Sequence, residues 1–144
     1  MNWKRVSAVG LGVAISAAVV GSSFAALPDD REATMKHIKR AYRPLAEMFK
    51  KSTFDANEAG KRGNEIAAYL QQFKDLFPAG SERADDKASP NIWTNRAGFE
   101  TARTNAYAAA LAVTKATDAA SFLVAYKTLG GTCTSCHDKF ATLK

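Results

Sequence analysis

The sequence predicts an all-α protein, an antiparallel four-helix bundle, and three observations support this fold class. After residue 25, no segment alternates apolar and polar residues as a strand would. Four segments instead carry apolar residues at the spacing of an amphipathic helix. Most of the links between them are short, so consecutive helices are expected to lie side by side and antiparallel.

The first 25 residues read as a signal peptide rather than as part of the fold. Lys4 and Arg5 precede an apolar stretch over residues 6–20, and Ser23 and Ala25 flank Phe24 in a small-x-small cleavage site. An uncleaved membrane anchor is the alternative, but glycine and serine dilute the apolar stretch. We therefore expect a signal peptide over 1–25, one domain over 26–144, and a periplasmic protein without stable membrane insertion after cleavage.

The net charge limits the classes of partner. The formal charge falls from +6 for all 144 residues to +4 once Lys4 and Arg5 are removed. This excess is mild, and no basic cluster interleaves with aromatic residues, so nucleic acid is not an expected partner. A protein partner that is steered by charge remains open.

The first two helices are expected over about 30–50 and about 55–77. Asp29 or Asp30 would cap the first, and Pro44 would kink or break it. Gly60 and Gly63 lie one turn apart on the second, where they either permit a close helix contact or occupy the surface. The apolar stripes are Met35, Ile38, Tyr42, Leu45 and Met48 or Phe49 in the first, and Ala59, Ile66, Leu70, Phe73 and Phe77 in the second.

A long loop over 78–89 precedes the third helix. Ser89 and Pro90 form a start signal, with serine as the cap and proline at the first helical position. This helix is expected to reach about residue 115, and a break near Thr117 and Asp118 begins the fourth. The third stripe is Ile92, Trp93, Ala97, Ala106, Ala110 and Val113.

The fourth helix carries the motif Cys133-Thr134-Ser135-Cys136-His137, a C-x-x-C-H sequence. This spacing is typical of covalent haem c attachment, in which two thiols form thioether bonds and the histidine binds the iron. Positions i, i+3 and i+4 leave one face of a helix. A redox disulfide or part of a zinc site are the alternatives, although no strand precedes the motif and only His37 could complete a set of four Cys and His ligands.

The motif belongs to a longer apolar stripe, so both cysteines should point toward the bundle core. Gly130 and Gly131 precede the motif, where they either kink the helix or let a flat macrocycle approach the backbone. The stripe is Phe122, Tyr126, Leu129, Cys133, Cys136, Phe140 and Leu143.

These features together resemble the class II cytochromes c, the cytochrome c-prime family, over the whole chain after residue 25. Residues 129–140 are similar to the family's C-terminal pattern, residues 90–93 with Phe99 to its third-helix motif, and residues 31–35 to its first-helix pattern. Ala141 departs from the arginine that members often carry there. The resemblance implies one haem c with iron, a homodimer through the first two helices as a possible assembly, and Met35 at the distal position, as in the Met-ligated low-spin branch.

Three side chains compete for the sixth position on the iron. In an antiparallel bundle Met35 lies level with His137, whereas Met48 is about 20 Å farther along the helix. His37 is rotated by roughly 200° from Met35 and should face water if the stripe faces inward. The alternative is that Met35 is an ordinary core residue that does not bind the iron.

The same end of the bundle should supply the surroundings of the haem. Arg31, one turn before Met35, would either meet a haem propionate or lie in solvent. The expected apolar shell, each member of which could equally be plain core, is Ile38, Phe73, Phe77, Trp93, Ala97 and Phe140.

The sixth ligand separates two functions. With His137 and Met35 bound, the protein is a single-electron carrier that serves an unidentified redox protein. Without Met35, a five-coordinate iron would bind NO or CO, and a structural or protective haem protein is a third alternative. No constellation of nucleophile, base and oxyanion donors is recognisable, so we do not expect an enzyme.

Overall fold

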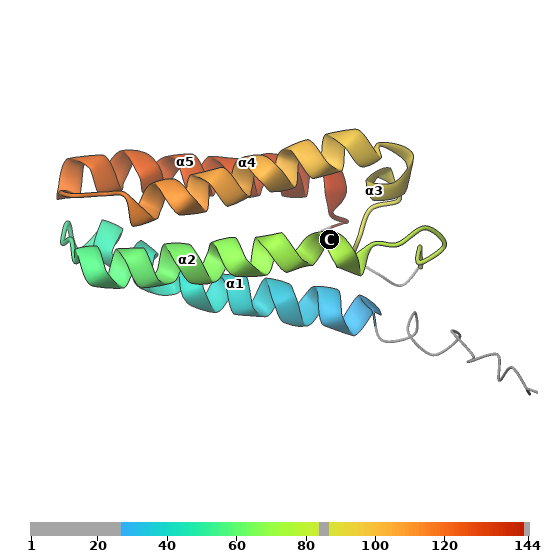
Figure 1. Cartoon of the computed structure of the whole chain (residues 1–144), viewed down its shortest axis with the longest axis horizontal. Helices are drawn as coiled ribbons and strands as arrows, with labels where there is room; N and C mark the ends of the chain where they lie inside the picture. Colours follow the sequence, from blue (N-terminus) through green and yellow to red (C-terminus); the bar gives the residue numbers. More distant parts are fainter. Residues whose placement is uncertain (1–26, 84–86, 143–144) are drawn as a thin grey trace, which may run out of the picture.

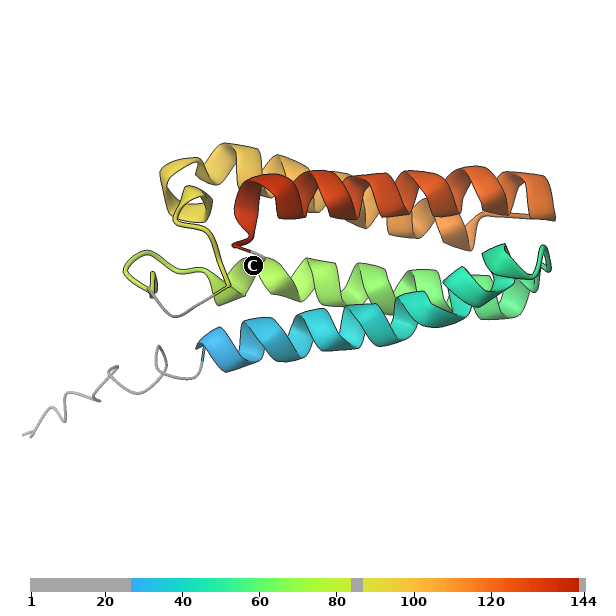
Figure 2. The ribbon, with the colours of Figure 1, turned by 180° about the vertical axis from the view of Figure 1, so that it is seen from behind.

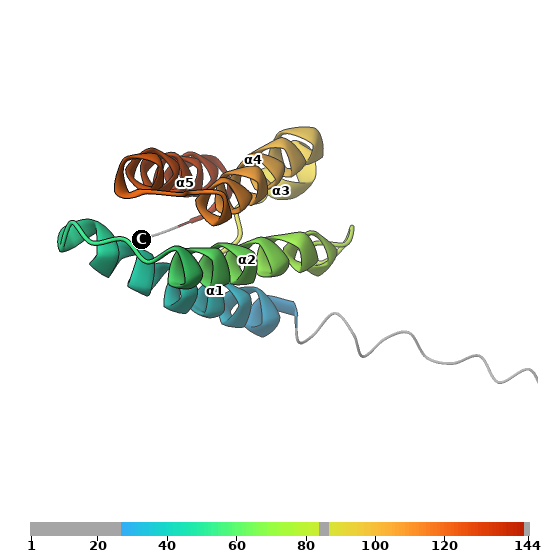
Figure 3. The ribbon, with the colours of Figure 1, turned by 60° about the vertical axis from the view of Figure 1, so that its left-hand side comes forward.

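The computed structural model describes residues 27–83 and 87–142, and four long helices dominate it. Helices α1 (Leu27–Lys50) and α2 (Ala56–Phe73) form one pair, and α4 (Arg96–Thr114) and α5 (Ala119–Phe140) form the other (Figures 1 and 2). The turned view in Figure 3 shows the two pairs as two layers. The layers meet mainly where α2 packs on α4. The predicted all-α four-helix bundle is confirmed. The predicted signal peptide over 1–25 lies outside the described residues.

Two short helices lie at one end of the bundle. The 3-10 helix η2 (Lys74–Leu76) continues α2, and α3 (Asn91–Thr94) precedes α4. The described residues contain no strand, only one isolated antiparallel bridge between Ala88 and Ala141. Within the same described part, no helix has the length and apolar character needed to cross a membrane.

Two aspartates fix the starts of helices. The Asp55 carboxylate accepts a hydrogen bond from the backbone N–H of Glu58 at 3.0 Å and caps α2. Asp118 forms a capping box with Ser121, whose N–H donates to the Asp118 carboxylate at 2.8 Å. These side chains satisfy N–H groups that the first helical turn leaves unpaired.

The first and third predicted helices differ from the structure. Helix α1 begins at Leu27, so Asp29 and Asp30 lie in its first turn, where negative charge complements the helix dipole, instead of capping it. Pro44 lies inside α1, which continues through it to Lys50. The predicted third helix is two helices because Asn95 leaves helical geometry (φ −126°, ψ 56°) and caps α4 by accepting from Gly98 N–H at 3.2 Å.

The apolar interior has two parts. The central core is rich in alanine where α2 meets α4, and it is filled by Leu45, Ile66 and Leu129, which are almost completely buried. A second, aromatic cluster occupies the end of the bundle that holds η2 and α3, and comprises Phe73, Phe77, Ile92, Phe99 and Phe140. The small residues bring α2 and α4 close together, whereas the bulky rings form a wall at one end.

Gly63 lies at a close contact between α2 and α4. A Cβ atom at this position would lie 2.7 Å from the Ala110 carbonyl oxygen and 2.7 Å from Cγ2 of Thr114. At Gly60, one turn earlier, a Cβ atom would meet nothing within 4 Å. The close-contact interpretation therefore holds for Gly63 and not for Gly60.

We expect Gly63→Ala to lower the free energy of unfolding by about 1–3 kcal/mol, because the added methyl group forces the two helices apart. Gly60→Ala is the matched control and should be neutral or stabilising by up to about 1 kcal/mol, because alanine favours the helix. Urea unfolding of both variants measures the difference. Equal stability of the two variants would contradict the close contact.

Candidate haem site

A cavity of about 550 Å³ opens at the end of the bundle where the aromatic cluster lies. Its size is within the range of small-molecule and cofactor sites. Helix α1 supplies Met35 and α5 supplies Cys136 and His137. The remaining apolar lining is Phe73, Phe77, Ala88, Ile92, Phe99, Phe140 and Ala141.

Helix α5 presents the C-x-x-C-H motif on one half-buried face. Cys136 and His137 line the cavity, and Cys133, one turn earlier, packs against the central core. Burial raises the pKa of Cys133, and burial together with the neighbouring Cys133 raises the pKa of Cys136 to about 11. Both free thiols are therefore protonated at neutral pH, and a protonated thiol is a poor nucleophile.

Gly130 and Gly131 do not interrupt α5, which is continuous from Ala119 to Phe140. A Cβ atom at Gly130 would lie 3.1 Å from the Tyr42 hydroxyl oxygen, so this glycine makes room for a tyrosine of α1. Tyr42 stacks on Tyr126 with ring centroids 5.2 Å apart. Burial and the hydrogen bond with Tyr126 raise the pKa of Tyr42, so the Tyr42 hydroxyl stays neutral beside Cys133.

Of the three candidates for the sixth position, the structure brings Met35 to the cavity. It is half-buried on α1 and lines the cavity with His137 of α5. Met48 is buried in the central core and lines a hollow with Phe122 and Leu123, near the start of α5. His37 is half-buried and stacks on Tyr69 at 5.0 Å.

The zinc alternative required His37 to join the cysteines and His137. The described residues contain no group of three or more His, Cys, Asp or Glu side chains placed to hold a metal ion. His37 instead stacks on Tyr69 and does not line the cavity with Cys136 and His137.

The structure places only some of the residues predicted for the apolar shell at the cavity. Phe73, Phe77 and Phe140 line the cavity, but Ile38 lies in the central core because it is almost one turn farther along α1 than Met35. Trp93 lies behind the cavity wall, where its ring meets Phe77 edge-on at 5.8 Å and its indole N–H donates to the Pro78 carbonyl at 2.9 Å. Ala97 is exposed.

Arg31 is a buried residue, with 4% of its surface exposed, so the solvated alternative is wrong. Its Nε donates to the Leu76 carbonyl at 2.9 Å, and its NH2 group donates to the Ser81 hydroxyl at 2.7 Å. The guanidinium also lies over the rings of Phe77 (4.5 Å) and Trp93 (5.2 Å). Arg31 thus holds the segment after α2 against α1 while it lines the cavity.

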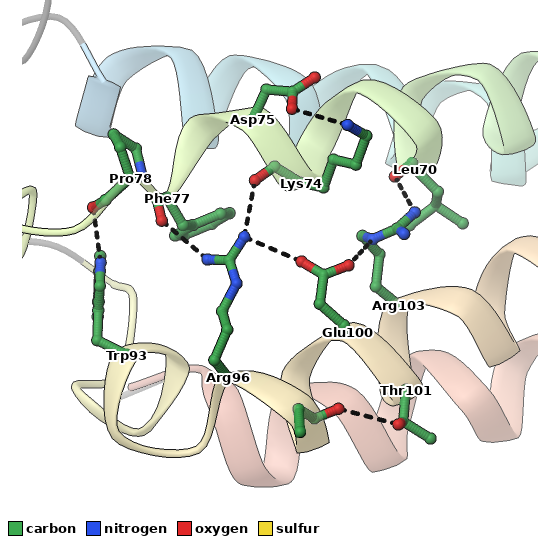
Figure 4. A network of polar contacts seen from close by, with 11 residues as sticks. Leu70, Lys74, Asp75, Phe77, Pro78, Trp93, Arg96, Glu100, Thr101 and Arg103 are labelled. Carbon is green, nitrogen blue, oxygen red and sulfur yellow. Dashed lines mark hydrogen bonds and ion pairs between the residues drawn. The ribbon is translucent and has the colours of Figure 1, made fainter.

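A second arginine holds the same segment from α4, as Figure 4 shows. Arg96 donates to the carbonyl oxygens of Phe77 (2.8 Å) and Lys74 (3.2 Å), and Arg103 donates to that of Leu70 (3.1 Å). Glu100 lies between the two arginines, 3.0 Å from Arg96 and 2.9 Å from Arg103. Cations near the last carbonyls of a helix complement its dipole, so the network fixes the wall formed by Phe73 and Phe77.

The cavity has a charged rim that was not predicted from the sequence. Lys36, Lys39 and Lys87 line it together with Glu32. Glu32 pairs with Lys36 at 2.9 Å and with Lys87 at 3.8 Å, and the hydrogen bond and charge of Lys36 are the main causes that lower the pKa of Glu32. The sequence positions of Lys36 and Lys39, one and four residues after Met35, could have indicated that these lysines lie near the cavity.

The end of the chain closes the cavity. Ser89 N–H donates to the Phe140 carbonyl at 3.1 Å, and Thr142 N–H donates to the Lys87 carbonyl at 2.8 Å. These bonds fasten the loop before α3 to the end of α5, beside Phe140.

The residues present fit a haem. A flat apolar macrocycle requires an apolar cavity, and two thiols on one helical face suit two thioether bonds. An imidazole and a thioether at the same cavity are the donor set of a six-coordinate haem iron. Three lysines at the rim are suitable partners for propionates.

The comparisons with known proteins agree with this site. The family model described as cytochrome C' matches residues 27–141. The chain is 35% identical over 133 residues to the cytochrome c' of Rhodopseudomonas palustris, which covers 88% of this chain and 91% of the relative. It is 32% identical over 147 residues to the cytochrome c-556 of Agrobacterium fabrum, which covers 100% of this chain and 99% of the relative.

Solved structures give the same result. The cytochrome c' structure from Rhodopseudomonas palustris superposes with a TM-score of 0.75 at 33% identity, over 82% of this chain and 97% of that one. The cytochrome c prime from Shewanella frigidimarina superposes with a TM-score of 0.74 at 27% identity, over 83% of this chain and 97% of that one. The chain therefore belongs to the cytochrome c' family, the class II cytochromes c, and carries one covalently attached haem c.

Proposed function

We propose that this protein transfers single electrons through a haem c whose iron would be held by His137 and Met35. The observation that carries the proposal is the presence of both side chains at one cavity, on helices that face each other across it. Cys133 and Cys136 would form the two thioether bonds. The haem iron supplies the one-electron chemistry, and a thioether ligand favours its reduced state and raises the potential.

The residues of the chain do the remaining work. The rings of Phe73, Phe77 and Phe140 exclude water from the cavity, which keeps the surroundings of the iron apolar. Arg31 and Arg96 fix that wall from opposite sides, so the cavity should change little in shape when the charge of the iron changes. A site that rearranges little on gaining an electron suits a carrier.

The alternative is a five-coordinate protein that binds NO or CO, and it depends on the same side chain. If Met35 lines the cavity without binding iron, the distal side keeps an open position in an apolar pocket. The cavity position of Met35, beside Cys136 and His137, favours ligation over this alternative.

The cellular setting follows from the same proposal. Thioether attachment of haem c requires an exported chain, and the segment over 1–25 supplies the expected signal. We therefore infer a periplasmic location. The partner would be another redox protein, and we infer no enzymatic role, because the residues around the cavity serve to hold and shield a haem.

The first test is the visible and far-red spectrum of the purified protein. We expect low-spin iron in both oxidation states and, in the oxidised form, a weak far-red charge-transfer band from a sulfur–iron bond. Met35→Leu should abolish this band, lower the potential and allow CO to bind. Met48→Leu is the control and should change none of these, because Met48 lies in the central core. A high-spin spectrum that is insensitive to Met35→Leu would instead support the gas-binding function.

The second test concerns attachment. Haem should remain with the chain in a denaturing gel, because two covalent bonds survive unfolding. Cys133→Ser and Cys136→Ser should each leave one bond and shift the pyridine haemochrome spectrum, whereas Ser135→Ala, at an exposed position within the motif, should not. Haem that is lost from the unmodified protein on denaturation would contradict the assignment of both cysteines.

A further inference from the structure

The outer face of α1 carries an unusual density of positive charge. Six exposed residues make up what we call the α1 basic stripe: Lys36, Lys39, Arg40, Arg43, Lys50 and Lys51, the last directly after the helix. At about 100° per residue these positions share one side of the helix. The opposite side holds the buried Ile38, Ala41, Leu45 and Met48.

This stripe accounts for the whole positive charge of the chain after the predicted signal peptide. Residues 36–51 contain six basic residues and one acidic residue, a formal charge of +5. The rest of 26–144 contains twelve basic and thirteen acidic residues, a formal charge of −1. If the positive charge served solubility alone, it would not have to lie on one side of one helix.

Little of the charge on the stripe is neutralised locally. Lys36 pairs with Glu32 at 2.9 Å and Lys50 with Glu47 at 3.3 Å, and both pairs are exposed. Within residues 27–83 and 87–142, no carboxylate pairs with Lys39, Arg40, Arg43 or Lys51. The stripe therefore presents a field that attracts an anionic surface.

The stripe also has a defined relation to the cavity. Lys36 and Lys39 line the cavity, while Arg40, Arg43, Lys50 and Lys51 continue along α1 away from it. Fifteen helical steps span about 22 Å, a length that suits a small protein interface. A partner seated along the stripe would have one end at the mouth of the haem cavity.

We propose that the α1 basic stripe is the docking surface for an acidic face of a partner protein. Electron transfer to that partner rests on the function proposed above, whereas binding to the stripe does not require Met35 to bind iron. Complementary charge speeds encounter and fixes orientation more than it adds affinity, which suits a transient complex.

Two other occupants fit less well. A membrane-surface helix needs an apolar face to insert. Over residues 29–50 of α1, the one large exposed apolar residue is Phe49, which points away from the stripe and stacks on Tyr126 at 4.8 Å. A symmetric homodimer with the stripe at its centre would place the same positive residues against each other. Like charges in such a contact oppose association.

The test uses the haem-loaded protein and two double variants with the same change in net charge. Arg40→Glu/Arg43→Glu alters the stripe, and Lys115→Glu/Lys127→Glu alters exposed positions at the end of α4 and on α5. Immobilised polyglutamate is the probe at low ionic strength. We expect the stripe variant to lose at least about tenfold in affinity, the control to lose much less, and salt to weaken binding of the unmodified protein.

Several outcomes would overturn the proposal. Equal loss in both double variants would show that only net charge matters. Binding to phosphatidylglycerol vesicles but not to polyglutamate would assign the stripe to a lipid surface. Sedimentation that showed a dimer in the unmodified protein, dissociated by Arg40→Glu/Arg43→Glu alone, would assign it to self-association. Met35→Leu should bind polyglutamate like the unmodified protein, which separates failure of the docking surface from failure of the electron-transfer function.

Discussion

The structure depends on a conflict between tight helix packing and room for a macrocycle. A bundle of this size gains stability by bringing helices together, and α2 and α4 do so through alanines and Gly63. A haem attached to α5 requires the opposite, a cavity between α1 and α5 at one end. The chain separates the two requirements along its length, with small residues and compact packing in the centre and large rings around a cavity at the end that holds His137.

The cavity needs walls that do not collapse, and two arginines, the buried Arg31 and the exposed Arg96, support them. The segment after α2 has little regular structure, yet the carbonyl oxygens of Leu76 and Phe77 accept from Arg31 and Arg96, which approach from α1 and α4. Charge-assisted hydrogen bonds of this kind are stronger than neutral ones. The hydrogen bond to its backbone carbonyl thereby fixes Phe77, and the Phe77 ring both lines the cavity and packs against the Arg31 guanidinium.

Local pattern was enough to predict the fold and the centre of the site. The C-x-x-C-H motif and the stripe around it placed Cys136, His137 and Phe140 on one helical face, and antiparallel pairing placed Met35 level with them. The break at Asn95 and the lysine rim were missed although their signals are local, whereas the burial of Arg31 was missed because it depends on contacts between distant segments. Arg31 illustrates this, since its partners Leu76 and Ser81 lie 45 and 50 positions away. Trp93 and Ile38 were expected at the cavity but do not line it. A helical stripe shows which residues face the core, but it does not show which layer of the core each residue joins.

The hydrogen bonds from the loop at Lys87 and Ser89 to Phe140 and Thr142 affect the order in which the molecule folds. The α1–α2 and α4–α5 hairpins join neighbours in sequence, and such local pairings form quickly. The cavity, by contrast, needs Met35 and His137, which are 102 positions apart, and a wall completed by Phe140 and Ala141 at the end of α5. The cavity therefore stays incomplete until α5 has packed against α1. Loss of the hydrogen bonds at Ser89 and Thr142 would therefore open this wall while the helices remain.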